Sequence, residues 1–254
     1  MKKILLLFSV ALSANLFSQK QKSSEHSWLD IGLKGGYGPT VIVNNNIWND
    51  KNIHTAITCG YVYGGKLGWN FNFDHEVAAD VTVTTFKQKF NVKPADSTNL
   101  NYNKNISFSS LNIALLYRHH ANGGYMEIGP QMNILKKTSD ATTSGNTATD
   151  VSKNYTPQYY GMVFGFGGSM FGGENFAFLM GTRMTYGFSD LITNSGGRST
   201  TQSYPMNDPR YVPNYKAYKA IHPFAIMLVA EFDFDVGYFT KASCGRGRKK
   251  FITF

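Results

Sequence analysis

Apolar and polar residues alternate along most of the chain. In the segment 28–38, for example, Leu29, Ile31 and Leu33 are apolar, whereas the residues between them are charged or glycine. A period of two places alternate residues on opposite faces of a β-strand. Eight segments show this pattern, and we predict a strand in each: 28–38, 56–72, 76–91, 105–118, 124–136, 158–170, 175–190 and 221–237.

The connections between these segments alternate in length. Three short turns lie near 72–75, 119–123 and 172–174, and four long polar loops lie near 39–55, 92–104, 137–157 and 191–220. Outer-membrane barrels have short periplasmic turns and longer outer loops. We therefore predict an all-β fold: an eight-stranded antiparallel up-and-down transmembrane β-barrel with short periplasmic turns and long extracellular loops.

A soluble barrel of the lipocalin type is the main alternative, because it also has eight strands. In such barrels the larger apolar residues tend to point inward and charged residues cover the outside. Here most segments exceed the usual strand length of about 5–6 residues. Their length fits a tilted membrane strand of about 9–11 residues with an extension beyond the bilayer. Segment length, loop alternation and the scarcity of charge on the apolar face favour the membrane.

The first 19 residues have the features of a secretory signal peptide. Lys2 and Lys3 form a basic start, an apolar run covers 4–12, and Ser18 supplies a small residue before the cleavage point. The apolar run is too short and too interrupted for a transmembrane helix. We predict three parts: a signal peptide at 1–19, an outer-membrane β-barrel at 20–239 and a basic periplasmic tail at 240–254.

Composition agrees with a membrane barrel and argues against nucleic-acid binding. Aromatic residues make up 15% of the chain, which has 25 glycines and a mean hydropathy of −0.26. Aromatic residues suit the two membrane interfaces, and alternation keeps the mean hydropathy low. The net charge of +9 comes largely from the signal and the tail, so no basic face for nucleic acid is expected. Cys59 and Cys244 are predicted at opposite ends of the barrel and do not pair.

Charged residues on the polar faces are expected to point into the barrel. An eight-stranded barrel is just wide enough for its own side chains to fill it. Opposite charges should pair there, because a lone buried charge is costly. We expect an ionic plug that is a structural network, with a gate or ion path as the alternative. The predicted network comprises Lys34, Lys66, Asp80, Arg118, Glu127, Arg183, Glu231 and Asp233.

No residue pattern predicts catalysis, a metal or a cofactor. His119 and His120 are adjacent in a short turn, where neighbouring strand residues point in opposite directions. His222 with Ser189 or Asp190 is the only candidate for a lipid hydrolase at the barrel rim, and chance explains it better, because serine and aspartate are common at strand ends. The chain has no Gly-x-Ser-x-Gly elbow and no phosphate-binding loop.

Two segments are candidates for partner contacts. The last loop carries tyrosines between prolines, and tyrosine offers apolar area with a polar tip. An aromatic belt with an ordinary lid is the alternative for these residues: Tyr204, Tyr211, Tyr215 and Tyr218. The basic tail at 241–250 could contact peptidoglycan, anionic lipid or an acidic protein surface, although short basic runs are more often solvated and disordered.

The opening strand Trp28-Leu29-Asp30-Ile31-Gly32-Leu33-Lys34-Gly35-Gly36-Tyr37 follows a short signal that ends in Phe-Ser-Gln, and an aromatic strand covers 221–239. In these features and in its eight strands, the chain resembles the PorT-like, OmpA-type outer-membrane β-barrel family of Bacteroidota. The resemblance implies outer-membrane residence and, for some members, a part in type IX protein secretion or gliding. The chain departs from the simplest pattern by ending in a basic tail, so either Phe239 or Phe254 could be the terminal aromatic residue that assembly machinery recognises.

The function expected from this sequence is a non-enzymatic outer-membrane barrel that belongs to, or assists, a protein-secretion or envelope complex. The expected partners are outer-membrane lipid and proteins of that complex, without nucleic acid and without a cofactor. Two alternatives remain: a lipid-modifying enzyme at the barrel rim, and a narrow pore.

Overall fold

A computed structural model describes most of the chain: residues 27–93, 101–142, 148–173, 175–193, 197–198, 205–206, 208, 211–213, 215–241 and 249–253. The predicted signal peptide, Tyr204 and Cys244 lie outside these residues. Within them, no helix has both the length and the apolar character needed to cross a membrane.

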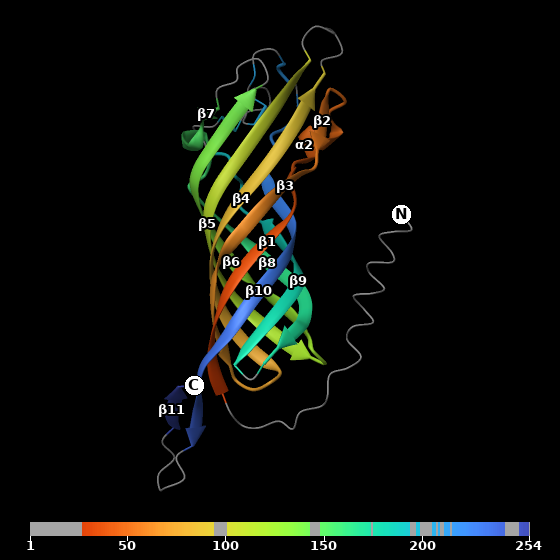
Figure 1. Cartoon of the computed structure of the whole chain (residues 1–254). Helices are drawn as coiled ribbons and strands as arrows, with labels where there is room; N and C mark the ends of the chain where they lie inside the picture. Colours follow the sequence, from red (N-terminus) through yellow and green to blue (C-terminus); the bar gives the residue numbers. More distant parts are fainter. Residues whose placement is uncertain are drawn as a thin grey trace, which may run out of the picture.

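Eight long strands form a closed antiparallel barrel (Figure 1). Each strand pairs with the next long strand in the chain, and β1 pairs with β10 to close the ring. The predicted eight-stranded up-and-down barrel is therefore confirmed. Its strands are β1 (Ser27–Val43), β3 (Thr58–Asn70), β4 (His75–Val92), β5 (Tyr102–Ala121), β6 (Gly124–Thr142), β8 (Gln158–Gly172), β9 (Phe176–Gly187) and β10 (His222–Lys241).

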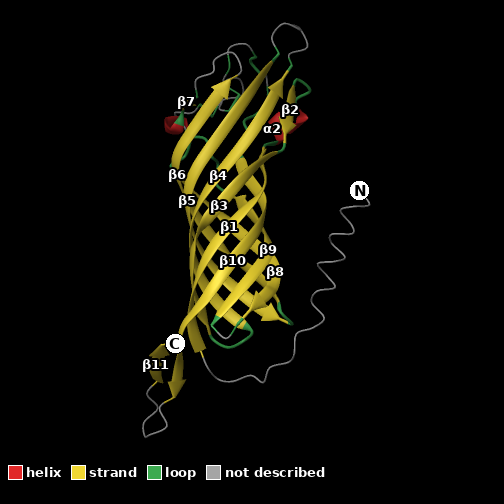
Figure 2. Cartoon of the chain, in the orientation of Figure 1, coloured by secondary structure: helices red, strands yellow, loops and turns green. Residues whose placement is uncertain are grey.

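Five short elements lie at the ends of the barrel (Figure 2). They are α2 (Asn45–Asn49), β2 (Ile53–Ala56), β7 (Thr149–Asp150), the 3-10 turn η3 (Ser152–Asn154) and β11 (Lys249–Thr253). β2 pairs with β4, and β7 pairs with β6. β11 pairs with the last residues of β10, so this part of the predicted tail continues the sheet beyond the barrel.

The three short turns lie at one end of the barrel, where β1 starts and β10 leaves the ring; we call this the short-turn end, and the opposite one the loop end. The turn between β5 and β6 has only two residues, because Ala121 pairs with Gly124. Asn122 and Gly123 have φ values of 52° and 77°. Two successive residues with positive φ give a type I′ hairpin, whose twist matches that of the strands it joins.

The predicted facing of the strands is confirmed: apolar residues point outward and charged residues point inward. On β4, Val81 is 51% exposed and Asp80 is 1% exposed. Aromatic residues gather on the outer surface near both ends, as lipid-facing barrels require at their two interfaces. Trp69, Phe71, Tyr117 and Phe176 lie near the short-turn end, and Tyr37, Tyr61, Tyr160 and Tyr186 lie near the loop end.

Several strands extend farther toward the loop end than predicted. β1 continues to Val43 and β6 to Thr142, where loops were expected to begin at 39 and 137. Near the loop ends of β4 and β5, the polarity of the two faces is the inverse of that in the rest of each strand. On β4, Phe86 and Phe90 point inward and are buried, whereas Lys87 points outward. The two faces therefore meet different surroundings at the two ends of one strand.

Inward residues at the loop ends of the strands and residues of the loops together form an apolar core. We call it the outer core. Its buried members are Ile42, Ile47, Ile53, Phe86, Phe90, Val92, Tyr102, Ile106, Phe108, Val151, Tyr155, Leu191, Ile192, Met206 and Ile221. Because loop residues supply about half of this core, the loops are packed onto the barrel and close its loop end.

Candidate functional site

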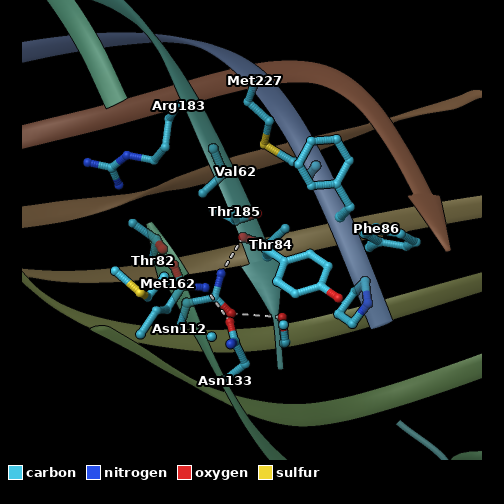
Figure 3. A pocket seen from close by; sticks show the side chains of 18 of the residues that line it. Val62, Thr82, Thr84, Phe86, Asn112, Asn133, Met162, Arg183, Thr185 and Met227 are labelled. Atoms are coloured by element: carbon cyan, nitrogen blue, oxygen red, sulfur yellow. Dashed lines mark hydrogen bonds between the residues drawn. The ribbon is translucent and has the colours of Figure 1, made fainter. Parts of the chain in front are cut away.

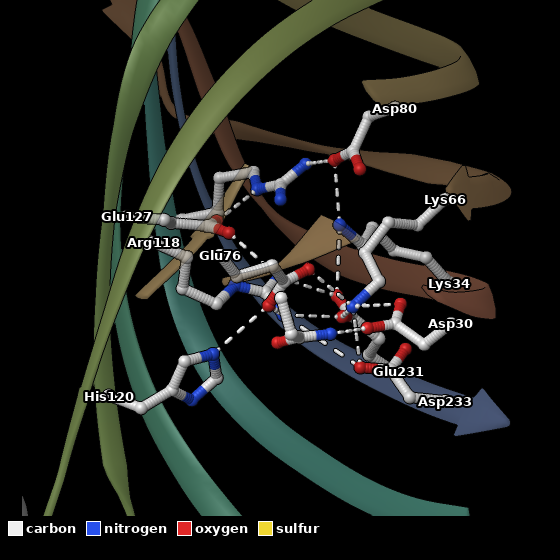
Figure 4. A network of polar contacts seen from close by, with 12 residues as sticks. Asp30, Lys34, Lys66, Glu76, Asp80, Arg118, His120, Glu127, Glu231 and Asp233 are labelled. Carbon is white, nitrogen blue, oxygen red and sulfur yellow. Dashed lines mark hydrogen bonds and ion pairs between the residues drawn. The ribbon is translucent and has the colours of Figure 1, made fainter. Parts of the chain in front are cut away.

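Most of the charged residues inside the barrel form one network toward the short-turn end (Figure 4), whereas Lys104 and Asp140 form a separate ion pair near the loop end. All eight predicted lumen residues belong to it, and each of them is at most 9% exposed. They come from seven of the eight long strands, so the network spans the whole cross-section of the barrel.

Two lysines form ion pairs with carboxylates of β1, β4 and β10. Lys66 Nζ lies 2.6 Å from Asp233, 2.8 Å from Glu76, 3.0 Å from Asp30 and 3.2 Å from Glu231. Lys34 Nζ lies 2.6 Å from Asp80 and 2.9 Å from Glu231. Glu231 is shared by both lysines, so β1, β3 and β10 are cross-linked through a single carboxylate.

Arg118 is at the centre of the network and is fully buried. Its Nη1 donates to Glu231 at 2.8 Å and to Glu76 at 3.4 Å, and its Nη2 donates to Glu127 at 2.9 Å. The guanidinium carbon lies 4.5 Å from the ring centre of Tyr125, which is a cation–π contact. One side chain of β5 therefore connects β4, β6 and β10.

Arg183 completes the ring of contacts on the β9 side. Its Nη1 lies 2.8 Å from Asp80, and its Nε lies 2.7 Å from Glu127. Asp80 also contacts Lys34, and Glu127 also contacts Arg118. The ion pairs therefore run without interruption from β1 through β4, β9, β6 and β5 to β10.

Three members of the network were not predicted: Asp30, Glu76 and His120. Asp30 and Glu76 occupy inward positions of their strands, so strand parity could have identified them. His120 Nε2 lies 3.0 Å from Glu76, and its side chain is 27% exposed, so it links the network to the short-turn end. With these residues, six carboxylates meet four permanent cations inside the barrel.

Inward glycines make room for these carboxylates. A Cβ atom on Gly32 would lie 2.3 Å from Asp233 Oδ1, and one on Gly68 would lie 2.4 Å from Asp30 Oδ1. Both distances are far below van der Waals contact, so a larger residue would displace a charged partner. The glycines of the polar faces are thus part of the site.

A layer of amide and hydroxyl groups separates the ionic network from the outer core (Figure 3). Ser110 Oγ donates to Asn112 Oδ1 at 2.8 Å, Asn112 donates to Thr84, and Gln131 donates to Asn133. The cavity beside these groups has a volume of about 40 Å³. That is space for roughly three water molecules, and it is too small for an organic ligand.

Tyrosines bond the described part of the last loop within 205–221, which we call the lid, to other loop residues. Tyr211 and Tyr215 donate their hydroxyl groups to Asp50 Oδ2, at 2.7 and 3.1 Å, and Tyr218 donates to Asp190 at 2.7 Å. Burial, together with the hydrogen bond to Asp50, raises the pKa of Tyr211 to about 12. These three hydroxyl groups bond within the chain, in agreement with the lid alternative, and contact of the tyrosines with a partner stays a prediction.

The side chains of Asn44 and Asn46 connect the same lid to α2. Asn44 caps the helix by accepting from the backbone N–H groups of Asn46 and Ile47, and its amide donates to the carbonyl of Lys219 at 2.8 Å. Asn46 donates to the carbonyl of Ala217 at 2.8 Å. The first and last loops of the barrel are therefore joined by polar contacts above the outer core.

The residues considered for catalysis at the rim are engaged elsewhere. His222 Nδ1 bonds the carbonyl of Gly187 at 3.1 Å, and Ser189 Oγ accepts from the backbone of Tyr160 at 3.1 Å. Asp190 accepts from the backbone of Ile221 and from Tyr218. None of these contacts joins Ser189, Asp190 or His222 to another of the three.

The histidines of the short-turn end point to different partners, as adjacent strand residues do. His119 Nδ1 lies 3.0 Å from the carbonyl of Asp74, whereas His120 faces Glu76 in the lumen. Among the described residues, no group of three or more histidine, cysteine or acidic side chains could hold a metal ion. Cys59 is exposed and free near the loop end.

Comparison with known proteins does not identify a family for this chain. No family model matches the chain, and no curated protein matches it. The chain is similar to the solved structure of Neisserial surface protein A, with 12% identity and a TM-score of 0.40, over 84% of this chain and 99% of that one. It is also similar to OprG from Pseudomonas aeruginosa, with 10% identity and a TM-score of 0.41, over 84% and 96%.

A third similar structure is Ail, the attachment invasion locus protein of Yersinia pestis, in complex with the heparin analogue sucrose octasulfate. Its identity is 13% and its TM-score is 0.40, over 82% of this chain and 99% of that one. The assignment of this chain as a closed eight-stranded barrel rests on its own strand pairing, with an apolar exterior and a charged interior.

Proposed function

We propose that this chain is an outer-membrane protein that works as a closed, non-enzymatic barrel, and that it serves a protein-secretion or envelope complex through the surfaces at its two ends. The observation that carries this proposal is the combination of an apolar exterior with a filled interior. The exterior fits lipid, and the ion pairs and outer core leave no open path among the described residues.

Residence in the membrane is supported by the outward side chains. Large apolar residues such as Leu33, Leu67 and Leu228 are 54–67% exposed, which a monomeric protein in water does not sustain over its whole circumference. The closed ring leaves no unpaired edge in the barrel wall, which is the condition for a sheet to cross lipid.

Orientation and location can be tested together through Cys59. In a Cys244→Ser background, a membrane-impermeant maleimide should label Cys59 on intact cells, because the residue lies near the loop end and is exposed. Labelling that needs cell lysis would contradict the proposed orientation. A wild-type protein that stays monomeric in water without detergent would contradict membrane residence itself.

The interior favours a closed barrel over a pore. A cavity of about 40 Å³ cannot conduct hydrated ions, and the charges beside it are paired. We expect no steady conductance of the purified protein in planar bilayers. A stable open state in most insertions would support the narrow-pore alternative and refute the closed barrel.

The proposed role in secretion or in an envelope complex is supported by the resemblance of the opening strand to the PorT-like family. It is also supported by the surfaces at the two ends of the molecule. The lid gives a fixed surface outside, and β11 extends the sheet beyond the short-turn end. Cross-linking in cells, followed by mass spectrometry, should identify envelope proteins with wild type, and fewer with a chain truncated after Phe239. A secretome unchanged by deletion of the gene would exclude secretion and leave an envelope role.

A further inference from the structure

The outward residues of β4, β5 and β6 change from apolar to polar at one height. Cross-strand pairing places Val83, Leu111 and Ile134 in one row, and this row is apolar. The next row toward the loop end contains Thr85, Ser109 and Lys137. Because the change occurs in register on three strands, it marks the upper limit of the lipid-facing surface on this side of the barrel.

Above this limit lies a cluster of cations whose rows contain, among the described residues, a single acidic residue, Asp150; we call this cluster the lysine face. Lys87 pairs across the strands with Ser107, and Lys89 with Asn105. Ser107 in turn pairs with Ser139. The lysine face consists of Lys87, Lys89, Lys136 and Lys137, with Asn105, Ser107, Ser109 and Ser139 between them.

A β-bulge contributes to this face. The β5–β6 register shifts between Ser109 and Ser110, so that Ser109 pairs with Lys137 and Ser110 with Leu135. The extra residue is Lys136, and both Lys136 and Lys137 are exposed. Two consecutive strand residues normally point to opposite faces, so the bulge supplies a second cation where regular pairing would give one.

The four lysines form no salt bridge with any described residue. Asp150 of β7 pairs with Ser139 in the β6–β7 register and lies beside the face, where its negative charge also interacts with the charges of Lys137 and Lys153. Its carboxylate accepts from Ser152 Oγ at 2.6 Å and from Ser152 N at 2.9 Å. Within the part of the chain that the structure describes, the side-chain hydroxyl and amide groups between the lysines have no hydrogen-bond partner, so they can bond an oxygen-rich ligand.

The position of the lysine face along the membrane normal indicates which ligand it binds. Successive rows are about 7 Å apart along a strand, or roughly 5 Å along the membrane normal at the usual tilt. Lys137 and Lys87 therefore lie about 5 and 10 Å beyond the last apolar row, which is the depth of the lipid headgroups. The opposite side of the barrel presents Tyr160, Tyr186 and Phe188 at its loop end instead.

We propose that the lysine face binds the phosphate groups of a phosphorylated glycolipid in the leaflet that surrounds the loop end. Charge complementarity and continuity with the apolar surface below it on the same strands identify a lipid, because the acyl chains would then contact Val83, Leu111 and Ile134. The serine and asparagine side chains bond the sugar hydroxyl groups. This inference rests on the proposed membrane residence.

The experiment compares two variants with equal change in charge. One replaces the face (K87Q/K89Q/K136Q/K137Q), and the other replaces four exposed lysines of the lid region (K51Q/K153Q/K216Q/K219Q). Each protein is refolded in detergent, and folding is checked by heat-modifiable migration and circular dichroism. Diphosphorylated lipid A and phosphatidylcholine are then titrated separately, and the bound lipid is measured by native mass spectrometry.

Wild type and the lid variant should bind lipid A in preference to phosphatidylcholine. The face variant should bind lipid A at least about tenfold more weakly, since each lysine near an anionic surface contributes roughly fivefold. Equal binding by the face and lid variants would overturn the inference. Insertion of wild type into phosphatidylcholine vesicles is measured separately: failure to insert would refute membrane residence, whereas insertion without preference for lipid A in the titration would overturn the lysine face alone.

Discussion

Removal of Arg118 should destabilise the barrel more than any other single change in the lumen. The Arg118→Met variant keeps a long side chain, but it leaves Glu76, Glu127 and Glu231 without the cation that contacts all three. The side chain of Arg118 has no exposed surface, so water cannot replace the lost contacts. Breaking a buried ion pair in this way typically costs about 3–5 kcal/mol.

That cost corresponds to about two to nearly four orders of magnitude in the equilibrium constant for folding. It can be measured by urea titration of protein refolded in vesicles, with tryptophan fluorescence as the signal. Lys216→Met is the matched control, because it also removes a cation but from an exposed site outside the lysine face, and it should change the free energy by less than about 0.5 kcal/mol.

A double variant, Arg118→Met with Glu231→Gln, tests whether charge is the reason. It removes the carboxylate that shares two ion pairs with lysines and two hydrogen bonds with Arg118. We expect it to recover at least about 1 kcal/mol of the loss, as coupled residues do. A loss below about 1 kcal/mol in Arg118→Met, the value of an exposed pair, would refute the reasoning.

Three further predictions concern the wall, the lumen and the lid. Val81→Arg should destabilise the inserted barrel by about 2–4 kcal/mol, and Thr82→Arg by clearly less, in the same urea titration; equal losses would contradict the facing. Gly32→Ala should cost about 1–3 kcal/mol because its Cβ meets Asp233 Oδ1 at 2.3 Å, whereas Gly35→Ala, whose nearest atom is 4.0 Å away, should be close to neutral. Burial and Asp50 raise the pKa of Tyr211 to about 12, so the stability it gives the lid is complete below pH 10 and is lost as the pH approaches 12. Limited proteolysis of the last loop should therefore increase over this range, and less so in Tyr211→Phe, where the group that titrates is absent.

Strand number, strand facing and the charged residues of the lumen could be predicted from the sequence. Lipid and lumen impose opposite polarity on alternate residues, so neighbours such as Asp80 and Val81 show their directions without a structure. The same rule could have identified Asp30 and Glu76, which share the parity of the residues chosen.

The structure of the loop end could not be predicted from that rule. The predicted segment 76–91 includes Phe86 and Phe90, but a pattern defined by lipid contact does not indicate that these apolar residues point inward. The lid depends on contacts between distant segments: Tyr211 and Asp50 are 161 residues apart. No local pattern indicates that the tyrosine hydroxyl groups bond inside the chain.

The inversion of polarity along β4 has a consequence for how the strands pair during assembly. A slip of one residue against β5 would turn Asp80 toward lipid and Val81 into the ionic network. A slip of two residues toward the short-turn end keeps the faces, but it would move Lys87 toward hydrocarbon and Phe86 from the outer core toward the charges. Errors of either kind are penalised, so the sequence of one strand specifies both its partner register and its depth in the bilayer.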